Sequence, residues 1–378
     1  MNPKSACGGG SLPQNVRVLK SGNLFFALLL LLMAGCSTTS RRSNPPPPDW
    51  EGMTVSPPVP PTQPPAPAPK PALSPLAKPA PATVFTTTWI PLDAWSRANG
   101  LTAPLRISAG TQASYAVITP RGLLALKGNS RMAHWNGMGL QLGFAPQETN
   151  GLFLLHTLDL EKNLQPLLKP SLLPEKNRRV IVVDPGHGGI NTGTRSTLDG
   201  HFEKEYTLDW ARRLQPLLEA RGWTVFLTRT NDVEVSLSNR VAFAEAHHAD
   251  FFVSLHFNAP PRPAPEASGL ETYCLTPAGM PSNLLRDAED DVLENFPNNA
   301  FDEQNLQYAV RLHRALLAVN GNEDRGVSHA RFLGVLRRQN RPAVLVEAGF
   351  LSNPREARHI ADPAYRQKLA MAVAEALN

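Results

Sequence analysis

Apolar runs alternate with segments of helical periodicity along residues 178–378. The runs that are continuous enough to be buried strands cover residues 180–183, 251–257 and 343–346. Between the first two, Tyr206, Trp210 and Leu214 recur at the spacing of one helix face. Buried strands that alternate with helices are typical of an α/β domain. This part of the chain is therefore predicted to contain a mainly parallel sheet.

Residues 85–172 show a different pattern, with short strand-like runs separated by Gly and Asn turn signals. Runs such as 114–119 and 122–126 predict strands, and 94–99 predicts a short helix. The segment is expected to fold as a small α+β or mostly β domain. Its pattern, which begins with Trp89-Ile90-Pro91-Leu92, resembles the small N-terminal domain of copper amine oxidases. A wall-targeting AMIN-like module is the alternative.

Residues 36–84 are a linker by composition. Between residues 45 and 81 there are 16 prolines, a composition that favours extended polyproline II and cannot bury a core. At roughly 3 Å per residue, such a segment spans about 110 Å when fully extended. The linker is predicted to act as a spacer, with a Pro-rich recognition motif as the alternative.

Residues 1–35 have the pattern of a sorting signal, with basic residues ahead of the apolar run 24–33. That run is shorter than the roughly 20 residues that span a bilayer. Leu32-Met33-Ala34-Gly35-Cys36 resembles the lipobox of bacterial lipoproteins, which implies cleavage before Cys36 and lipidation of its thiol. We expect a membrane-anchored lipoprotein of the periplasm or cell envelope. Ser37 favours the outer membrane over the inner, while plain secretion and an uncleaved anchor are the alternatives.

Net charge and cysteine content bear on two further questions, nucleic-acid binding and disulfide formation. The formal net charge is +5, but residues 1–35 contain two Lys, one Arg and no acid, so their removal leaves +2. Nothing in the remainder resembles a basic nucleic-acid stripe, and no nucleic-acid partner is predicted. Of the three cysteines, Cys7 leaves with the signal and Cys36 would be lipidated. Cys274 is expected to be a small buried hydrophobe without a disulfide.

Residues with metal-binding chemistry stand at the ends of the predicted strands. His187 follows the first buried run, His256 ends the second, and Glu347 ends the third. Open α/β sheets bind their ligands at the carboxyl ends of the strands, so these three side chains are expected to converge. Two histidines and a glutamate at one edge suggest a zinc hydrolase centre.

Four motifs occur in an order and spacing that resemble a known family. They are Asp184-Pro185-Gly186-His187-Gly188-Gly189, Glu203-Lys204-Glu205-Tyr206-Thr207-Leu208, Ser254-Leu255-His256-Phe257-Asn258-Ala259 and Glu347-Ala348-Gly349-Phe350-Leu351-Ser352-Asn353. Across residues 178–378 they resemble the zinc-dependent N-acetylmuramoyl-L-alanine amidases of the type 3 class. The resemblance implies a twisted, mostly parallel sheet with helices on both faces. It also implies one Zn²⁺ held by His187, Glu203 and His256, with Glu347 as the catalytic carboxylate.

General metal chemistry agrees with these assignments. A catalytic zinc takes three protein ligands from His, Asp or Glu and keeps a fourth position for water. It can lower the pKa of that water from about 15.7 to about 7 in favourable sites. Glu347 can then take a proton from the attacking water and pass it to the leaving amine.

Two of the assignments have competitors. His201 and Glu205 lie within two residues of Glu203 at a predicted helix start, where acids also simply favour the helix dipole. The position in the family motif selects Glu203. A buried Glu347 could instead pair with Arg325 or Arg331.

Further polar residues accompany the motifs. Asp184 is predicted to orient His187 from behind, with a structural hydrogen bond to the following turn as the alternative. Asn258 lies on the same strand face as His256 and is expected either to contact substrate or to anchor a loop. Arg229 and Arg240 fit salt-bridge or helix-surface roles better than catalysis.

Residues 276–303 form an acidic segment that interrupts the predicted fold. A solvated insertion is the favoured interpretation. In some members of the resembled family an inserted helix in this part of the domain blocks the zinc site until a partner moves it. An autoinhibitory segment with a protein activator is therefore the alternative.

The resemblance implies a peptidoglycan hydrolase that cleaves the amide between N-acetylmuramic acid and the L-alanine of the stem peptide, in wall remodelling or cell separation. A zinc peptidase acting on another amide and a catalytically silent wall-binding lipoprotein are the alternatives. The sequence contains no Gly-x-Ser-x-Gly elbow, no His-Glu-x-x-His helix and no phosphate loop. The commonest competing hydrolase classes are thereby excluded.

Overall fold

The computed structural model describes residues 88–378, except 109–111, 172, 176–178, 259–263 and 286–289. The predicted signal peptide, the lipidation site Cys36 and the predicted linker lie outside the described residues. Among the helices that are described, none combines the length and the apolar character needed to cross a membrane. The described residues, from 88 onward, belong to one compact unit.

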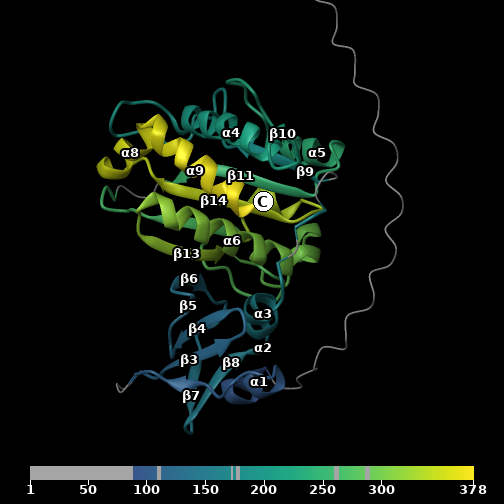
Figure 1. The fold of residues 1–378 in the computed structure, drawn as a ribbon, viewed down its shortest axis with the longest axis vertical. Coiled ribbons are helices and arrows are strands. Elements are labelled where there is room, and N and C mark those ends of the chain that lie inside the picture. The colour runs from purple at the N-terminus through teal and green to yellow at the C-terminus, as the bar shows by residue number, and fades with distance from the viewer. Residues whose placement is uncertain (1–87, 109–111, 172, 176–178, 259–263, 286–289) are drawn as a thin grey trace, which may run out of the picture. The chain divides into compact units, whose positions relative to one another are not determined.

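Six strands of the C-terminal part build the sheet that holds the predicted site residues (Figure 1). In spatial order they are β10 (Trp223–Leu227), β9 (Arg179–Pro185), β11 (Phe251–Asn258), β14 (Ala343–Phe350), β12 (Leu270–Cys274) and β13 (Asp324–His329). The first four strands are parallel to one another, β12 is antiparallel to β14, and β13 is parallel to β12. The predicted α/β class is confirmed.

Helices cover both faces of this sheet (Figure 1). One face packs against α4 (Glu203–Glu219), α6 (Asp302–Asn320) and α9 (Pro363–Ala376). The other packs against α5 (Leu237–Ala246) and α7 (Gly334–Arg337), while α8 (Pro354–Ala361) follows β14. Neighbouring strand residues such as Val182 and Val183 belong to hydrophobic clusters on opposite faces of the sheet, and both are fully buried. Burial on both faces explains why these strands are continuous apolar runs in the sequence.

The N-terminal part combines short helices with two groups of antiparallel strands. One group contains β1 (Trp89–Pro91), β8 (Leu152–His156) and β7 (Gln147–Thr149). The other contains β2 (Leu105–Arg106), β3 (Ser114–Thr119), β4 (Gly122–Lys127), β5 (Met132–Trp135) and β6 (Met138–Gln141). The helical elements are α1 (Leu92–Ala98), α2 (Thr157–Asp159), the π-helix Leu160–Leu164 and α3 (Gln165–Leu168). The resemblance of this part to copper amine oxidase N-terminal domains stays a prediction.

Strands of the two parts join in one continuous sheet. Leu140 of β6 pairs with Val327 of β13, so the strands of the N-terminal part continue the larger sheet. The backbones approach closely here, because a Cβ added to Gly139 would lie 3.1 Å from the Cα of Gly326. The backbone N–H of Gly139 also donates to the Asp324 carboxylate at 2.7 Å.

The acidic segment 276–303 is described except for residues 286–289, and it includes the 3₁₀ helix Pro297–Phe301. Because β12 is antiparallel to β14, the chain leaves β12 beside the amino end of β14. The Asn298 side chain accordingly donates to the Arg341 carbonyl just before β14, at 2.7 Å. The described residues of this segment therefore lie at the edge of the sheet opposite the carboxyl ends of β9, β11 and β14. This position counts against the alternative in which the segment blocks the zinc site. Asp290 is not solvated either, because it forms an ion pair with Arg331.

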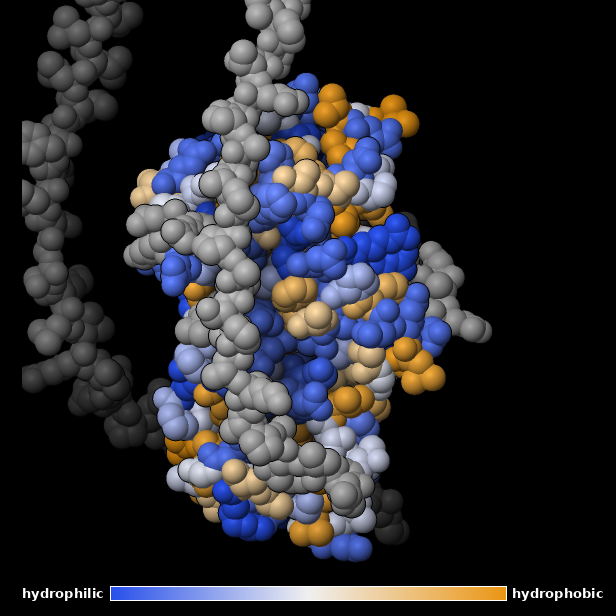
Figure 2. Space-filling view, turned by 90° about the vertical axis from the view of Figure 1, so that its right-hand side faces the viewer, coloured by the Kyte–Doolittle hydropathy of each residue, from blue (hydrophilic) through white to orange (hydrophobic). Residues whose placement is uncertain are grey.

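One side of the molecule is shown in Figure 2. On its visible part, hydrophobic residues occur in small separate groups between hydrophilic ones. Scattered apolar residues of this kind are normal for a protein surface.

Candidate active site

The structure brings His187, Glu203 and His256 together, as the sequence predicts. The Oε1 atom of Glu203 lies 3.1 Å from Nε2 of His187 and 2.9 Å from Nδ1 of His256. One donor atom from each residue lies within 4.8 Å of the others. The three side chains come from the loop after β9, the first turn of α4 and the end of β11. Two imidazole nitrogens and a carboxylate oxygen form a donor set that suits zinc.

Glu203, rather than its neighbour Glu205, faces the histidines. Its side chain is buried, and its Oε1 also accepts from the backbone N–H of Phe257 at 3.0 Å. Glu205 instead accepts from the Phe202 N–H at 3.0 Å and contacts His201 at 2.6 Å, so it caps the start of α4. Burial alone would raise the pKa of Glu203, but hydrogen bonds from the two histidines hold this pKa well below its usual range.

His187 lies in a constrained loop. Its φ of 63° is in the left-handed region, which non-glycine residues rarely adopt. Gly188 follows with a φ of 131°, and a Cβ added there would lie 2.1 Å from the Val233 carbonyl oxygen. The Oδ1 of Asn191 lies 2.8 Å from Nδ1 of His187 and fixes the ring from the side away from Glu203. A predicted metal ligand is thus held in a strained backbone conformation by its surroundings.

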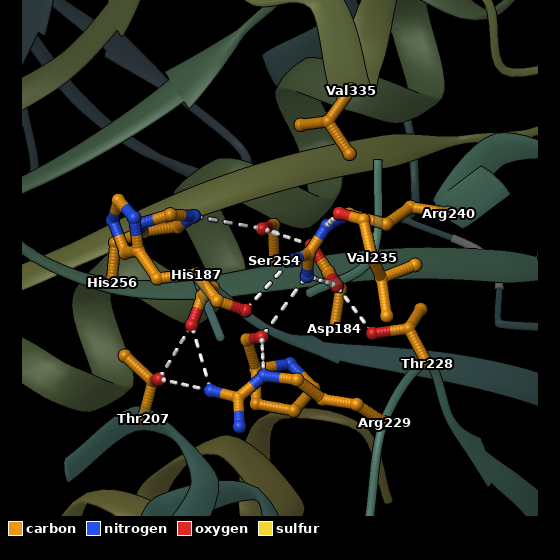
Figure 3. A network of polar contacts seen from close by, with 12 residues as sticks. Asp184, His187, Thr207, Thr228, Arg229, Val235, Arg240, Ser254, His256 and Val335 are labelled. Atoms are coloured by element: carbon orange, nitrogen blue, oxygen red, sulfur yellow. Dashed lines mark hydrogen bonds and ion pairs between the residues drawn. The ribbon is translucent and has the colours of Figure 1, made fainter. Parts of the chain in front are cut away.

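Two buried arginines hold this loop through its carbonyl groups (Figure 3). Arg229 donates to the carbonyls of Pro185 at 3.0 Å and Gly186 at 2.8 Å. Arg240 donates to the carbonyls of Pro185 at 3.0 Å and His187 at 2.7 Å. Burial and the neighbouring Arg240 lower the pKa of Arg229 to about 10, so Arg229 remains charged at neutral pH.

Asp184 supports the site from behind the sheet edge. It forms an ion pair with Arg240, confirming the predicted salt bridge, although Arg240 is buried rather than on the helix surface. Its carboxylate also accepts from Ser254 Oγ at 2.7 Å, and that hydroxyl lies 3.1 Å from Nε2 of His256 (Figure 3). Among the described residues, Asp184 therefore reaches His256 through Ser254 and reaches His187 through Arg240. The predicted role of Asp184 in orienting His187 stays a prediction, and Arg240 is the residue through which it would act.

Glu347 lies beside the histidine cluster through strand register. It pairs with His256 of β11 on one side and with Glu271 of β12 on the other. Paired residues on neighbouring strands point to the same face of a sheet, so the three side chains form a row across it. Asn258 donates to Glu271 at 3.4 Å, and Arg325 forms an ion pair with the same carboxylate at 3.4 Å. Asn258 thus contacts the end of this row.

The sequence reasoning missed Asn191, Ser254 and Glu271. Ser254 stands two residues before His256 on the same strand face, a spacing that could have indicated it. Asn191 lies four residues after His187 in a glycine-rich turn, a position that indicates contact with His187 less clearly. Glu271 enters only through the pairing of β12 with β14, which no local pattern shows.

Comparisons with known proteins identify the family of the chain. Residues 181–378 match the Amidase_3 family model, described as N-acetylmuramoyl-L-alanine amidase. The chain is 32% identical over 228 residues to the N-acetylmuramoyl-L-alanine amidase AmiA of Escherichia coli, covering 55% of this chain and 78% of AmiA. It is 33% identical over 241 residues to AmiC of Neisseria meningitidis, covering 57% of this chain and 55% of AmiC. The solved catalytic domain of CwlV, from Bacillus (Paenibacillus) polymyxa var. colistinus, is 28% identical, with 53% of this chain and 96% of that domain covered and a TM-score of 0.43. The chain therefore belongs to the Amidase_3 family and is an N-acetylmuramoyl-L-alanine amidase.

Proposed function

We propose that this amidase cleaves the bond between N-acetylmuramic acid and the stem-peptide L-alanine at a zinc site formed by His187, Glu203 and His256. The observation that carries the proposal is the convergence of these three side chains beside Glu347 at the carboxyl edge of the sheet. Zinc would supply Lewis-acid polarisation of the scissile carbonyl and would make the attacking water more acidic. We expect one zinc ion per catalytic domain.

Glu347 is the proposed general base. A carboxylate can take a proton from the attacking water and later donate it to the leaving amine nitrogen of L-alanine. Its place next to His256 in the strand register puts the carboxylate on the face where the three donor atoms meet. Glu271 lies beyond it in the same row and forms an ion pair with Arg325 at 3.4 Å.

The enclosing residues keep the ligands in position. Arg240 and Asn191 hold His187, while Ser254 and Asp184 hold His256. Residues behind metal ligands typically contribute about 10- to 100-fold to metal affinity. Their role is to fix donor atoms before substrate arrives, which reduces the reorganisation required during the reaction.

We further propose that the enzyme works on peptidoglycan in the cell envelope, held to a membrane through lipidated Cys36. The lipobox-like motif and the proline-rich linker of the sequence support this part of the proposal. The outer membrane remains the favoured attachment site because Ser37 follows the cysteine. Residue-level tests of the anchor are metabolic fatty-acid labelling of the wild type and of Cys36→Ala.

Mass analysis of purified peptidoglycan tests the catalytic proposal. Wild-type protein should release stem peptides that begin with a free L-alanine, and zinc-stripped protein should regain this activity on readdition of zinc. Glu347→Gln should bind one zinc per chain and release no stem peptides, whereas His256→Ala should lose both zinc and activity. Full activity of Glu347→Gln would eliminate Glu347 as the base, and full activity without any bound metal would eliminate the zinc site.

A further inference from the structure

A basic hollow lies on the face of the sheet opposite the metal cluster. It has a volume of about 200 Å³ and is lined by residues of the N-terminal part, of α6 and of the segment around α3. His256 lies four residues after Phe252 on β11, so both side chains are on the face that packs toward α5 and α7, whereas α6 packs on the other face. The hollow is therefore separate from the catalytic edge, and none of its lining residues belongs to the metal cluster.

The rim of the hollow is cationic. Its charged lining residues are Arg121, Lys169, Arg311 and Arg314, with no acidic residue among those that line it. Lys169 forms an ion pair with Glu303 at 2.6 Å, and Arg311 donates to the Ala376 carbonyl at 3.1 Å. Arg121 and Arg314 are exposed, and neither has an ion pair with any residue that the structure describes. Two guanidinium groups are therefore available to an anionic ligand.

A second observation also indicates a ligand. The hydroxyl oxygen of Ser171, a lining residue, is buried and has no hydrogen-bond partner among the described residues. Buried hydroxyl groups are normally hydrogen-bonded, so an unpaired one in a hollow marks a place for an external partner. Trp135 and Val310, both buried, supply an apolar floor beneath the cations. The combination suits a small group with an anionic head and an apolar body.

We propose that this hollow is a second wall-binding site that takes the carboxylate of a peptidoglycan stem peptide. The inference rests on the proposed function, because the stem peptides of the proposed substrate polymer bear free carboxylates. Guanidinium groups recognise carboxylates through paired hydrogen bonds. The hollow is smaller than the roughly 300–1,000 Å³ of a drug-sized site, so it fits a peptide end rather than a disaccharide.

A second contact on a repeating polymer has a physical consequence. Binding at two places turns the second event into an intramolecular one and raises the overall affinity for the polymer. The hollow would hold an uncleaved stem peptide while the catalytic edge works on another. A soluble fragment with a single peptide cannot occupy both places, so its hydrolysis should not depend on the hollow.

The test compares two charge-matched double variants of the full chain. Arg121→Gln with Arg314→Gln removes both available cations, and Lys127→Gln with Lys368→Gln removes two exposed cations that do not line the hollow. Cosedimentation with insoluble peptidoglycan is measured with Glu347→Gln added to both, so that the polymer stays intact. The hollow variant should bind about tenfold more weakly than the control, which is about 1.4 kcal/mol.

Two further arms identify the ligand. Peptidoglycan whose carboxylates have been converted to amides should bind the hollow variant and the control equally. Vesicles containing anionic phospholipid should also bind them equally. Equal binding of the two variants to unmodified peptidoglycan would overturn the proposal, as would a difference that persists on amidated peptidoglycan or one that occurs only on vesicles.

Activity on a soluble muramoyl-peptide separates this proposal from the proposed function. With Glu347 restored, the hollow variant and the control should hydrolyse that fragment at the same rate. If the hollow variant, the control and the wild type all failed to hydrolyse the fragment, that result would count against the proposed function. It would leave the binding result standing. A selective loss in the hollow variant would place the hollow in the catalytic site and overturn the second-site proposal.

Discussion

The two histidines of the proposed zinc site are positioned by different means. His256 lies within β11, where parallel pairing with β9 and β14 fixes its backbone. His187 lies just beyond the end of β9, with a left-handed φ of 63°, and buried guanidinium groups bind the carbonyls around it. His256 is therefore held mainly by sheet hydrogen bonds and His187 mainly by side chains. The loop ligand should consequently be much more sensitive to substitutions away from the donor set.

Arg240→Ala should have the largest effect. Arg240 is buried, pairs with Asp184 and donates to the His187 carbonyl, so its removal leaves a buried carboxylate without its cation. Breaking a buried ion pair from one side typically costs about 3–5 kcal/mol. Denaturant unfolding of the metal-free protein should show a loss of that order, together with a loss of zinc affinity. Arg358→Ala, an exposed arginine on α8, serves as the control and should change stability by less than about 0.5 kcal/mol. A loss below about 1 kcal/mol in Arg240→Ala would show that the loop does not depend on this network.

Gly188→Ala should distort the His187 loop selectively. The added Cβ would lie 2.1 Å from the Val233 carbonyl oxygen, so the backbone beside His187 must shift. Gly137→Ala is the matched control, because Gly137 also has a positive φ, at 81°, but nothing lies within 4 Å of its added Cβ. Backbone strain should cost about 1–3 kcal/mol in both variants. Only Gly188→Ala should also weaken zinc binding in a chelator competition, and equal zinc affinity in both variants would contradict this expectation.

Asn191→Ala and Ser254→Ala compare the side-chain supports of the two histidines directly. Asn191 contacts Nδ1 of His187 at 2.8 Å, and Ser254 contacts Nε2 of His256 at 3.1 Å. Loss of a support behind a metal ligand typically lowers metal affinity by about 10- to 100-fold. The loss of zinc affinity in Asn191→Ala should be near the upper end of this range, because the His187 loop lacks the strand pairing that still holds His256. Competition with a fluorescent zinc chelator measures both variants, and a larger loss in Ser254→Ala would reverse the comparison.

The same comparison explains how much of this protein could be predicted from its sequence. His187, His256 and Glu347 were predictable because each ends a buried apolar run, and the carboxyl ends of neighbouring parallel strands meet at one edge. The holding roles of Arg229 and Arg240 were not, because their carbonyl partners are more than 40 residues away in sequence. The sheet continuation into the N-terminal part was equally hidden, since it depends on a single residue pair between β6 and β13.

The smallest effect concerns Glu203, whose carboxylate contacts both histidines. Burial alone would raise its pKa, but the histidines lower it, so Glu203 stabilises the fold above its ordinary value of 4.5 and loses that contribution as the pH falls further. Burial alone would lower the pKa of His187, but Glu203 raises it, so this contribution is complete below 6.5 and is lost as the pH rises through the folded pKa. Both contributions therefore coincide between about pH 4.5 and 6.5. In the presence of a chelator, the difference in unfolding free energy between wild type and Glu203→Gln should be greatest in that window and should decline on either side. A difference that stays constant from pH 3.5 to 8 would show that the contact between Glu203 and His187 does not persist without metal, and His187 would then depend on Asn191 and the arginines alone.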